Sequence, residues 1–274
     1  MKPHEKGILK EIGKMLASPL SQLVANAATE DLAKLFEAYW CCLLGKGAGA
    51  GWALNTEINA AKSVIHTSHP VIFDVGANNG EWSLLLHKMF PESRIFLFEP
   101  QPACQKIIME KQIPNSKLIP NAVSSKRGTV QLYTTDETSV IASLHQRYES
   151  YLQSRTFYSI DVETITLDSV IEDNGLSCVD FIKMDIEGHE LDALKGVTKS
   201  LEKGIIKALS FEFGCGNINS RTFFRDFWNF LFPMNYRIYR ILPSSRLMPI
   251  ESYYEDCEYF LSVTNYIAVL DEIT

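Results

Sequence analysis

Apolar residues stand three or four positions apart through the first part of the chain. The spacing recurs over residues 8–44, for example in Ile8, Ile12 and Leu16, and it places these side chains on one face of a helix. The pattern predicts two or three amphipathic helices. A glycine-rich run at residues 45–51 then breaks the periodicity. We interpret it as a linker, because it lacks the Gly-Lys-Ser/Thr ending of a phosphate-binding loop.

A different pattern starts after residue 70. Short runs of β-branched and aromatic residues alternate with stretches of helical periodicity, which is typical of β-α-β units and a parallel sheet. Seven runs predict the strands of one sheet: Val71–Val75, Arg94–Phe98, Lys117–Val123, Val179–Met184, Ala208–Phe213, Arg237–Ile241 and Val263–Leu270. Two further runs, Thr129–Thr134 and Ile160–Thr166, predict a β insertion between the third and fourth strands.

The change of pattern also predicts the domain organisation. A further helix is expected from Asn55 to about Ile65, because asparagine is a favoured residue at a helix N-terminus. The boundary therefore falls near residue 66, with an N-terminal helical extension over residues 1–66 and one α/β domain over residues 67–274. The fold expected for that domain is a doubly wound, mostly parallel seven-stranded sheet.

Composition and charge narrow the classes of protein. Apolar residues make up 46 % of the chain and charged residues 22 %, the balance of a globular protein with a sizeable core. The formal net charge of −7 disfavours a nucleic-acid partner, because duplex binding depends on Lys and Arg neutralising many phosphates. The apolar run nearest to a membrane span, Leu35–Leu54, is interrupted by Glu37 and Lys46, so no transmembrane segment is expected.

The cysteines and the N-terminal residues bear on cellular location. The six cysteines show no Cys-x-x-Cys pair and no regular framework, which favours reduced thiols. The N-terminus lacks the apolar core and cleavage site of a secretory signal. A cytoplasmic location is therefore expected. The sequence leaves the oligomeric state open, with a homodimer as one alternative.

The first predicted strand of the sheet ends in a turn of small residues. The run Asp74-Val-Gly76-Ala-Asn78-Asn-Gly80 opens a predicted helix over residues 81–90. Small residues let a ligand approach the backbone, and in an open α/β sheet ligands bind beyond the carboxyl ends of the strands. A nicotinamide enzyme would prefer Gly-x-Gly-x-x-Gly around a diphosphate. Asp74 would repel a diphosphate but suits the cationic amino and sulfonium groups of S-adenosylmethionine.

The second predicted strand ends at Glu99 and Pro100. A carboxylate at that place can accept hydrogen bonds from a ribose diol, a device that dinucleotide enzymes and methyltransferases share. Glu99 therefore predicts a nucleoside cofactor without deciding which one. The alternatives are structural, since Asp74 could cap a turn and Glu99 could be solvated before the proline.

Four motifs, in this order, give the chain a resemblance to a known family. They are Asp-Val-Gly-Ala-Asn-Asn-Gly from residue 74, Phe-Glu-Pro-Gln-Pro from residue 98, Asn-Ala-Val-Ser from residue 121 and Lys-Met-Asp-Ile-Glu-Gly-His-Glu from residue 183. From about Val71 to Glu212 the chain resembles the FkbM-type methyltransferases. The resemblance implies a class I, Rossmann-like methyltransferase fold with an antiparallel last strand, and S-adenosyl-L-methionine as cofactor.

The resemblance also implies donor contacts at the ends of the first three strands, with Asp185 facing the methyl group across the sheet. The implied donor-binding residues are Asp74, Gly76, Asn78 and Gly80 for the methionine end, Glu99 with Pro100 for the ribose, and Asn121 and Ala122 for the adenine. The family methylates hydroxyl groups of sugars, polyketides and related metabolites. The implied acceptor is thus a small molecule or saccharide, and we favour a sugar hydroxyl in surface-polysaccharide biosynthesis.

Methyl transfer to an alcohol requires removal of the proton of the acceptor hydroxyl. A hydroxyl is a poor nucleophile until its proton leaves, and a positioned general base contributes about 10²–10⁴-fold. The candidates are Asp185, His189 and His145. Each has an alternative role: Asp185 could bind the donor, His189 could cap the next helix, and His145 could lie on the surface of the irregular insertion.

Metal assistance is a further alternative. Asp185, Glu187, His189 and Glu212 carry oxygen or nitrogen ligands near predicted strand ends. Their spacing does not demand a metal, so we expect none and expect activity to survive chelation.

The insertion is expected to form the acceptor side of the site, because the donor takes the space over the first two strands. Residues 143–155 include His145, Arg147 and several tyrosines, which suit sugar rings and phosphate groups. We expect them to form a mobile lid, unless the tyrosines pack on the core. Two other functions stay open: a nicotinamide-dependent oxidoreductase, and a non-catalytic protein that keeps a donor pocket.

Overall fold

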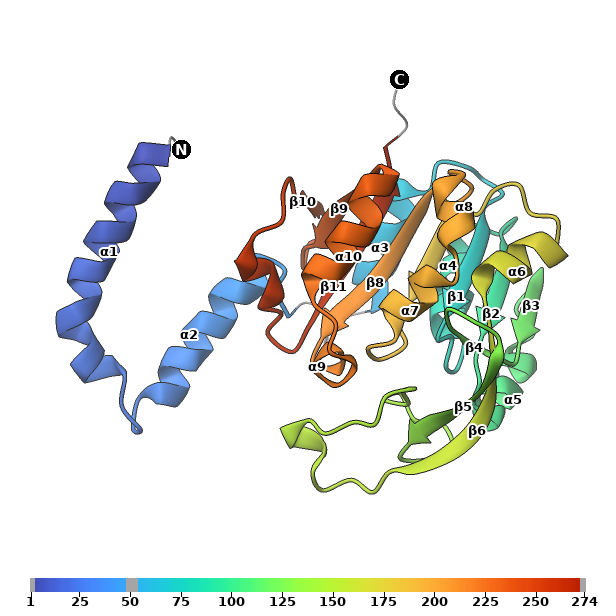
Figure 1. The fold of residues 1–274 in the computed structure, drawn as a ribbon, viewed down its shortest axis with the longest axis horizontal. Helices are drawn as coiled ribbons and strands as arrows, with labels where there is room; N and C mark the ends of the chain where they lie inside the picture. The colour runs from blue at the N-terminus through green and yellow to red at the C-terminus, as the bar shows by residue number, and fades with distance from the viewer. Residues whose placement is uncertain (1–2, 48–53, 272–274) are drawn as a thin grey trace. The chain divides into compact units, whose positions relative to one another are not determined.

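The structure is a computed structural model that describes residues 3–47 and 54–271 (Figure 1). The chain separates into two compact units, Met1–Leu44 and Gly45–Thr274. Each unit has its own architecture, and only the second contains a sheet among the described residues.

The first unit consists of helices α1 (Pro3–Val24) and α2 (Glu30–Leu43), which confirms the predicted helical pattern. Apolar side chains such as Ile12 and Leu35 are not covered by other residues of this unit. Neither of these helices, nor any other helix in the described ranges, combines the length and the apolar character that a membrane span requires.

The second unit is built around an eight-stranded sheet. In spatial order its strands are β10 (Leu247–Pro249), β9 (Tyr236–Ile241), β11 (Val263–Leu270), β8 (Ala208–Gly214), β7 (Phe181–Met184), β1 (Val71–Val75), β2 (Arg94–Phe98) and β3 (Ser116–Ile119). The five strands from β8 to β3 are parallel, and β11 runs antiparallel between β8 and β9. The predicted mostly parallel sheet with an antiparallel last strand is confirmed. The short β10, which pairs with β9, makes the sheet eight-stranded instead of seven-stranded.

The third predicted strand, Lys117–Val123, is divided between two sheets. β3 ends at Ile119, and Ala122–Val123 forms β4 of a second sheet. Pro120 lies at the break, and a proline has no N–H to donate to a strand ladder. The predicted single strand therefore ends early, and the chain leaves the central sheet here.

The second sheet is the predicted β insertion. It has the order β4-β6-β5, with β5 at Gly128–Thr134 and β6 at Tyr158–Ile165. Strand β5 pairs antiparallel with β6 over its full length. The residues between them are irregular except for a short 3-10 turn at Ser150–Leu152. Figure 1 shows this sheet in green and yellow, beside the edge of the central sheet.

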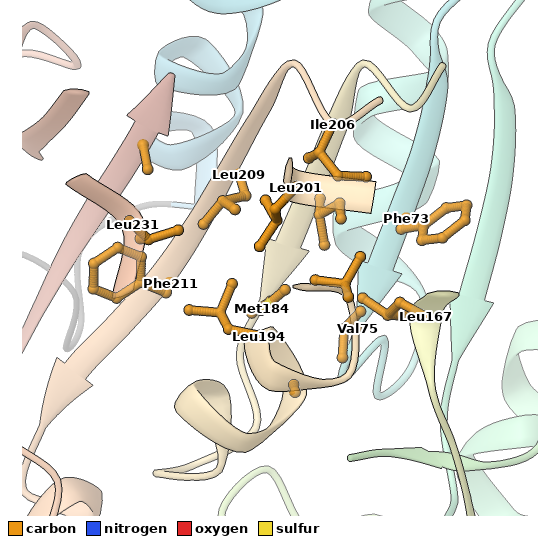
Figure 2. Close-up of a cluster of buried hydrophobic side chains, with 14 of the residues drawn as sticks. Phe73, Val75, Leu167, Met184, Leu194, Leu201, Ile206, Leu209, Phe211 and Leu231 are labelled. Atoms are coloured by element: carbon orange, nitrogen blue, oxygen red, sulfur yellow. The ribbon is translucent and has the colours of Figure 1, made fainter. Parts of the chain in front are cut away.

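Helices cover both faces of the central sheet. One face carries α3 (Leu54–Val64), α4 (Glu81–Met89) and α5 (Pro102–Lys111), and the other carries α6 (Leu167–Asp173), α7 (Glu190–Lys195), α8 (Thr198–Glu202) and α10 (Phe224–Leu231), while α9 (Gly216–Ser220) follows β8. Alternate residues of a strand point to opposite faces, so Phe73 and Val75 pack with Leu194 and Phe211 (Figure 2) whereas Ile72 packs on the α3 side. The sheet is therefore doubly wound.

The boundary between the compact units lies at Leu44, whereas the sequence pattern places a domain boundary near residue 66. The reason is α3, which buries Ile58, Ala61 and Val64 against the central sheet. This helix is amphipathic like those before it, and periodicity alone does not reveal what its apolar face contacts.

Candidate functional site

The carboxyl ends of β1, β2 and β7 meet at one edge of the sheet. β1 pairs with both of its neighbours, and the chain order reverses here, which is where open α/β sheets bind ligands. A cavity of about 220 Å³ opens at this edge. Predicted site residues that line it are Gly76, Asn78, Glu99, Pro100, Asn121, Ala122, Asp185 and His189. The other three, Asp74, Gly80 and His145, lie behind the lining.

The turn after β1 depends on backbone conformations that favour glycine. Gly76, Asn78 and Gly80 have φ angles of 80°, 46° and 74°, and Gly80 stands at the start of α4. A Cβ atom on Gly76 would lie 1.9 Å from the backbone oxygen of Asp185. Gly76 therefore lets the turn and the end of β7 approach each other closely, whereas we expected from the sequence that its small size would admit a ligand.

Gly76→Ala is expected to destabilise the protein and to weaken donor binding. The left-handed backbone alone costs about 1–3 kcal/mol for a residue with a Cβ, and the contact with Asp185 adds to that cost. Urea unfolding followed by circular dichroism measures the effect. The matched control is Gly128→Ala, where an added Cβ meets no atom within 4 Å; equal stability of the two variants would contradict this account of the turn.

Asp74 is completely buried below the turn. Its Oδ2 accepts a hydrogen bond of 2.6 Å from Ser83 Oγ on α4, and its Oδ1 lies 3.4 Å from Lys183 Nζ. Asp74 does not line the cavity, and the residue beside it that does is Lys183.

Lys183 connects the two strands at the centre of the site. Its Nζ lies 3.2 Å from Asp185 Oδ2 and donates a hydrogen bond of 3.1 Å to the backbone oxygen of Gly76. Burial disfavours the ammonium charge, but the carboxylates of Asp185 and Asp74 outweigh burial, and the pKa of Lys183 rises above its usual value. Sequence reasoning missed this residue, although a lysine within the apolar run of β7 is itself an unusual feature.

Glu99 is held by the backbone on both sides. Its Oε2 accepts a 2.7 Å hydrogen bond from the N–H of Asn78, and its Oε1 accepts one of 2.8 Å from the N–H of Gln101. Burial raises the pKa of Glu99, and these hydrogen bonds oppose the rise. A carboxylate has about four acceptor positions, so both oxygens keep a lone pair for the hydroxyls of a ribose.

The insertion reaches over the cavity beside Glu99. The backbone oxygen of Ser139 accepts hydrogen bonds from Gln101 Nε2 at 3.0 Å and from Asn78 Nδ2 at 3.4 Å, and Ser143 and Leu144 also line the cavity. Gln101 and Ser139 were not singled out from the sequence, because their roles depend on contacts between distant segments.

A smaller pocket lies behind Asp185, lined by Glu57, Glu212 and Asn265 among others. Glu57 comes from α3 and accepts a 2.8 Å hydrogen bond from Asn265 Nδ2. Burial and the nearby charge of Asp185 raise the pKa of Glu57 to about 7. The helix that the sequence assigned to the N-terminal extension thus contributes a carboxyl group beside the site.

Three predicted acidic residues come together at the ends of β7 and β8. Oxygens of Asp185, Glu187 and Glu212 lie within 4.8 Å of one another. Burial raises the pKa of Glu187 to about 7, and burial together with the charge of Asp185 raises that of Glu212 well above its usual value. Protonation of Glu212 relieves the repulsion. Of the four residues considered for a metal, these three therefore lie together, whereas His189 belongs to a different group with His145 and Asp192.

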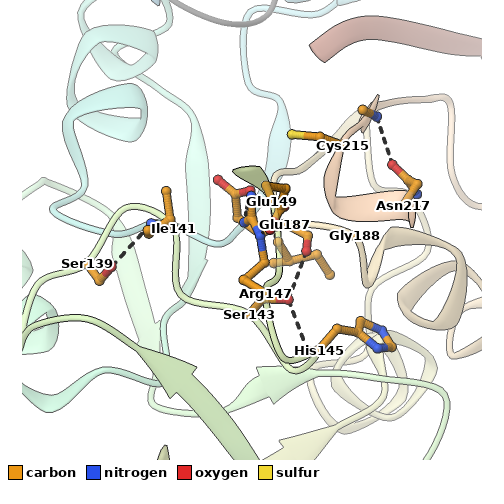
Figure 3. Close-up of polar contacts among 12 residues, drawn as sticks. Ser139, Ile141, Ser143, His145, Arg147, Glu149, Glu187, Gly188, Cys215 and Asn217 are labelled. Carbon is orange, nitrogen blue, oxygen red and sulfur yellow. Dashed lines mark hydrogen bonds and ion pairs between the residues drawn. The ribbon is translucent and has the colours of Figure 1, made fainter. Parts of the chain in front are cut away.

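Arg147 does not point a free charge at an acceptor. Its guanidinium forms ion pairs with Glu187 and Glu149 (Figure 3). It also donates a hydrogen bond to Tyr151 Oη, and the residue is only 4 % exposed. The predicted phosphate-binding role of Arg147 is therefore wrong, because the guanidinium is buried and paired with two carboxylates. The pair with Glu187 joins the insertion to the segment after β7. The ion pairs of Arg147 thus hold residues 143–149 against the segment after β7.

His145 and His189 form a hydrogen-bonded pair. His145 Nε2 lies 3.0 Å from His189 Nδ1, and Ser124 Oγ lies 3.0 Å from His189 Nε2. Burial lowers the pKa of His189 to about 4 and also lowers the pKa of His145. Both rings are consequently neutral at neutral pH, and both nitrogens of His189 are engaged.

The match to a known family is direct. The model of the methyltransferase FkbM domain matches residues 74–238, which include the turn, Glu99, the insertion and β7 with Asp185. The matched segment holds every predicted site residue.

Characterised proteins that are similar to the chain include three methyltransferases. Methyltransferase sdnD of Sordaria araneosa is 30 % identical over 47 % of this chain and 61 % of its own length. 2-O-methyltransferase NoeI of Sinorhizobium fredii is 28 % identical over 52 % of this chain and 63 % of its own. Hexuronic acid methyltransferase AglP of Haloferax volcanii is 30 % identical over 48 % and 52 %.

These alignments span about half to two thirds of each relative, while the family model covers more than half of this chain. The chain therefore belongs to the FkbM family of methyltransferases, whose methyl donor is S-adenosylmethionine.

Proposed function

We propose that the protein transfers the methyl group of S-adenosylmethionine to a hydroxyl of a sugar or related metabolite. The observation that carries the proposal is one cavity lined by both Glu99, which follows β2, and Asp185, which follows β7 on the other side of β1. The first suits the ribose of a nucleoside donor, and the second suits the proton of an incoming hydroxyl. The names of the 2-O-methyltransferase and the hexuronic acid methyltransferase support a saccharide acceptor. A role in surface-polysaccharide biosynthesis is part of this proposal.

In the proposed complex the turn after β1 receives the methionine end of the donor. Asn121 and Ala122 follow the end of β3 and line the cavity, as Glu99 does. This position suits the adenine of the donor. Most of the rate acceleration comes from holding donor and acceptor in line at close distance. In this scheme the residues that follow β1 and β2 bind the donor. The acceptor then enters from the side of β7.

Asp185 is the proposed general base. Its carboxylate is about one-third exposed and lines the cavity next to Lys183, so an acceptor hydroxyl can reach it. His189 also lines the cavity, but its two ring nitrogens are engaged by His145 and Ser124. A base that has no free lone pair cannot take the proton directly. No step in this scheme requires a metal ion.

The remaining features agree with a small-molecule reaction in the cytoplasm. The six cysteines, all of which lie in the described ranges, form no disulfide with one another, which agrees with a reducing compartment, and the net charge of −7 disfavours a nucleic-acid acceptor. Screening nucleotide sugars and lipid-linked saccharides with labelled S-adenosylmethionine would identify the acceptor. Thermal-shift titration with S-adenosylhomocysteine and with NAD tests the donor, since a ligand of the native state raises its stability. Stabilisation by NAD alone would favour the oxidoreductase alternative.

Glu99→Gln is expected to weaken donor binding by about 1.5–3 kcal/mol, the contribution of hydrogen bonds to a charged group. The amide cannot accept from both backbone N–H groups and both ribose hydroxyls. Titration calorimetry with S-adenosylhomocysteine measures the loss. The control is Glu110→Gln, an exposed residue on α5. Unchanged affinity in Glu99→Gln would remove Glu99 from the donor site.

A further inference from the structure

Two histidines and an aspartate come together beside the cavity, which only His189 among them lines. His145 belongs to the insertion, His189 immediately precedes α7, and Asp192 lies one turn into that helix. His145 Nε2 is 3.0 Å from His189 Nδ1, which is 3.8 Å from Asp192 Oδ2. One ligand atom from each of the three residues lies within 4.8 Å of the other two. Residues three apart on a helix share a face, which brings His189 and Asp192 together.

We propose that His145, His189 and Asp192 bind a divalent transition-metal ion, with Zn²⁺ as the best match. Two imidazoles and one carboxylate are ligands that Zn²⁺ accepts at about 2.0–2.2 Å. In a tetrahedral site such ligand atoms stand about 3.3 Å apart, and the distances of 3.0 and 3.8 Å lie on either side of that value. The ion would replace the hydrogen bond between the two rings.

The groups around these three residues favour the ligand geometry. Ser124 Oγ contacts His189 Nε2 at 3.0 Å, and when that nitrogen carries the proton, the lone pair of Nδ1 points toward His145 and Asp192. Lys195 Nζ donates to Asp192 Oδ1 at 2.9 Å, which leaves Oδ2 for the ion. Hydrogen bonds of this kind orient metal ligands and tune their affinity.

The proposed site joins parts of the molecule that are far apart in the sequence. His145 lies in the insertion, while His189 and Asp192 lie at the start of α7, whose Leu191 and Leu194 pack in the core on the central sheet. A bound ion would therefore fasten the insertion to α7, in addition to the ion pairs of Arg147. Three protein ligands leave one position of a tetrahedral ion open to water or to an oxygen of the acceptor. Methyl transfer through Asp185 does not depend on this ion.

Titration of the EDTA-treated, tag-free protein with Co²⁺ tests the proposal without donor or acceptor. We expect one equivalent to bind, with a visible absorption band and no thiolate charge-transfer band, and Zn²⁺ to displace it. His145→Ala and Asp192→Asn should each weaken binding about 100-fold, and Ser124→Ala about tenfold, in the range measured for groups that support metal ligands. His69→Ala, at an exposed histidine before β1, should bind as the native protein does.

Hydrogen exchange provides a second readout. Zn²⁺ should slow exchange of residues 139–146 in the native protein and leave it unchanged in Asp192→Asn. Absence of stoichiometric binding, a thiolate band, or equal affinity in Asp192→Asn and His69→Ala would overturn the site. None of these measurements uses methyl transfer, so failure of this site can be told apart from failure of the proposed function. The kcat for methyl transfer in EDTA is a separate measurement, and it shows whether the reaction needs a metal ion.

Discussion

Asp185→Asn is expected to lower kcat for methyl transfer by about 10²–10⁴-fold, the contribution of a positioned general base. The amide keeps the size of the carboxylate but does not take up the proton of the acceptor hydroxyl. Donor affinity should stay close to that of the native protein, because the ribose is proposed to bind at Glu99 after β2, and β1 lies between β2 and β7. Single-turnover kinetics with the acceptor found by screening, together with calorimetry for the donor, measure the two effects separately.

The matched control for this variant is Asp161→Asn, an exposed residue on β6, which should retain native kcat. A fall of less than tenfold in Asp185→Asn would mean that the proton leaves by another route. A large loss of donor affinity would instead place Asp185 among the donor contacts.

Lys183→Met is expected to destabilise the protein by about 3–5 kcal/mol, the cost of leaving a buried charge without its partner. Asp74 is completely buried and would then keep only the hydrogen bond from Ser83. Urea unfolding at neutral pH measures the loss. Adding Asp74→Asn to Lys183→Met should recover most of it, because the buried charge is removed.

Lys126→Met is the control for the loss of a lysine charge, since Lys126 is exposed and substitutions at such sites stay within about 0.5 kcal/mol. If the double variant is no more stable than Lys183→Met alone, Asp74 is not the reason for the loss. Lys183 would then contribute mainly through Gly76 and Asp185.

Local patterns in the sequence were sufficient for most of the fold. The strands Val71–Val75, Arg94–Phe98 and Val263–Leu270 have the predicted bounds, because each is a largely buried run rich in β-branched and aromatic residues. The errors come from partners that a local pattern does not contain. Pro120 ends β3 early by removing a donor from the ladder, and α3 belongs with the sheet because of what its apolar face contacts.

The candidate site was predictable where one short segment carries it. Two such segments are the turn from Asp74 to Gly80 and the end of β2 at Glu99. Their residues line the cavity or lie directly behind its lining. Contacts between distant segments could not be predicted from the sequence. One example is Arg147, which forms ion pairs with Glu187 and Glu149. Such pairing depends on the path of the insertion, and no spacing along the chain encodes that path.

The way in which the insertion is attached has a consequence for evolution within the family. The chain leaves through β4 and returns through β6, and these two strands pair with each other at Ala122–Thr164 and Val123–Ile165. Exit and entry are therefore neighbours, and the residues between them can lengthen, shorten or be exchanged without changing the register of β1, β2 and β7. In the proposed function, changes in this segment can alter the acceptor preference, while the residues after β1 and β2 that bind the donor stay the same.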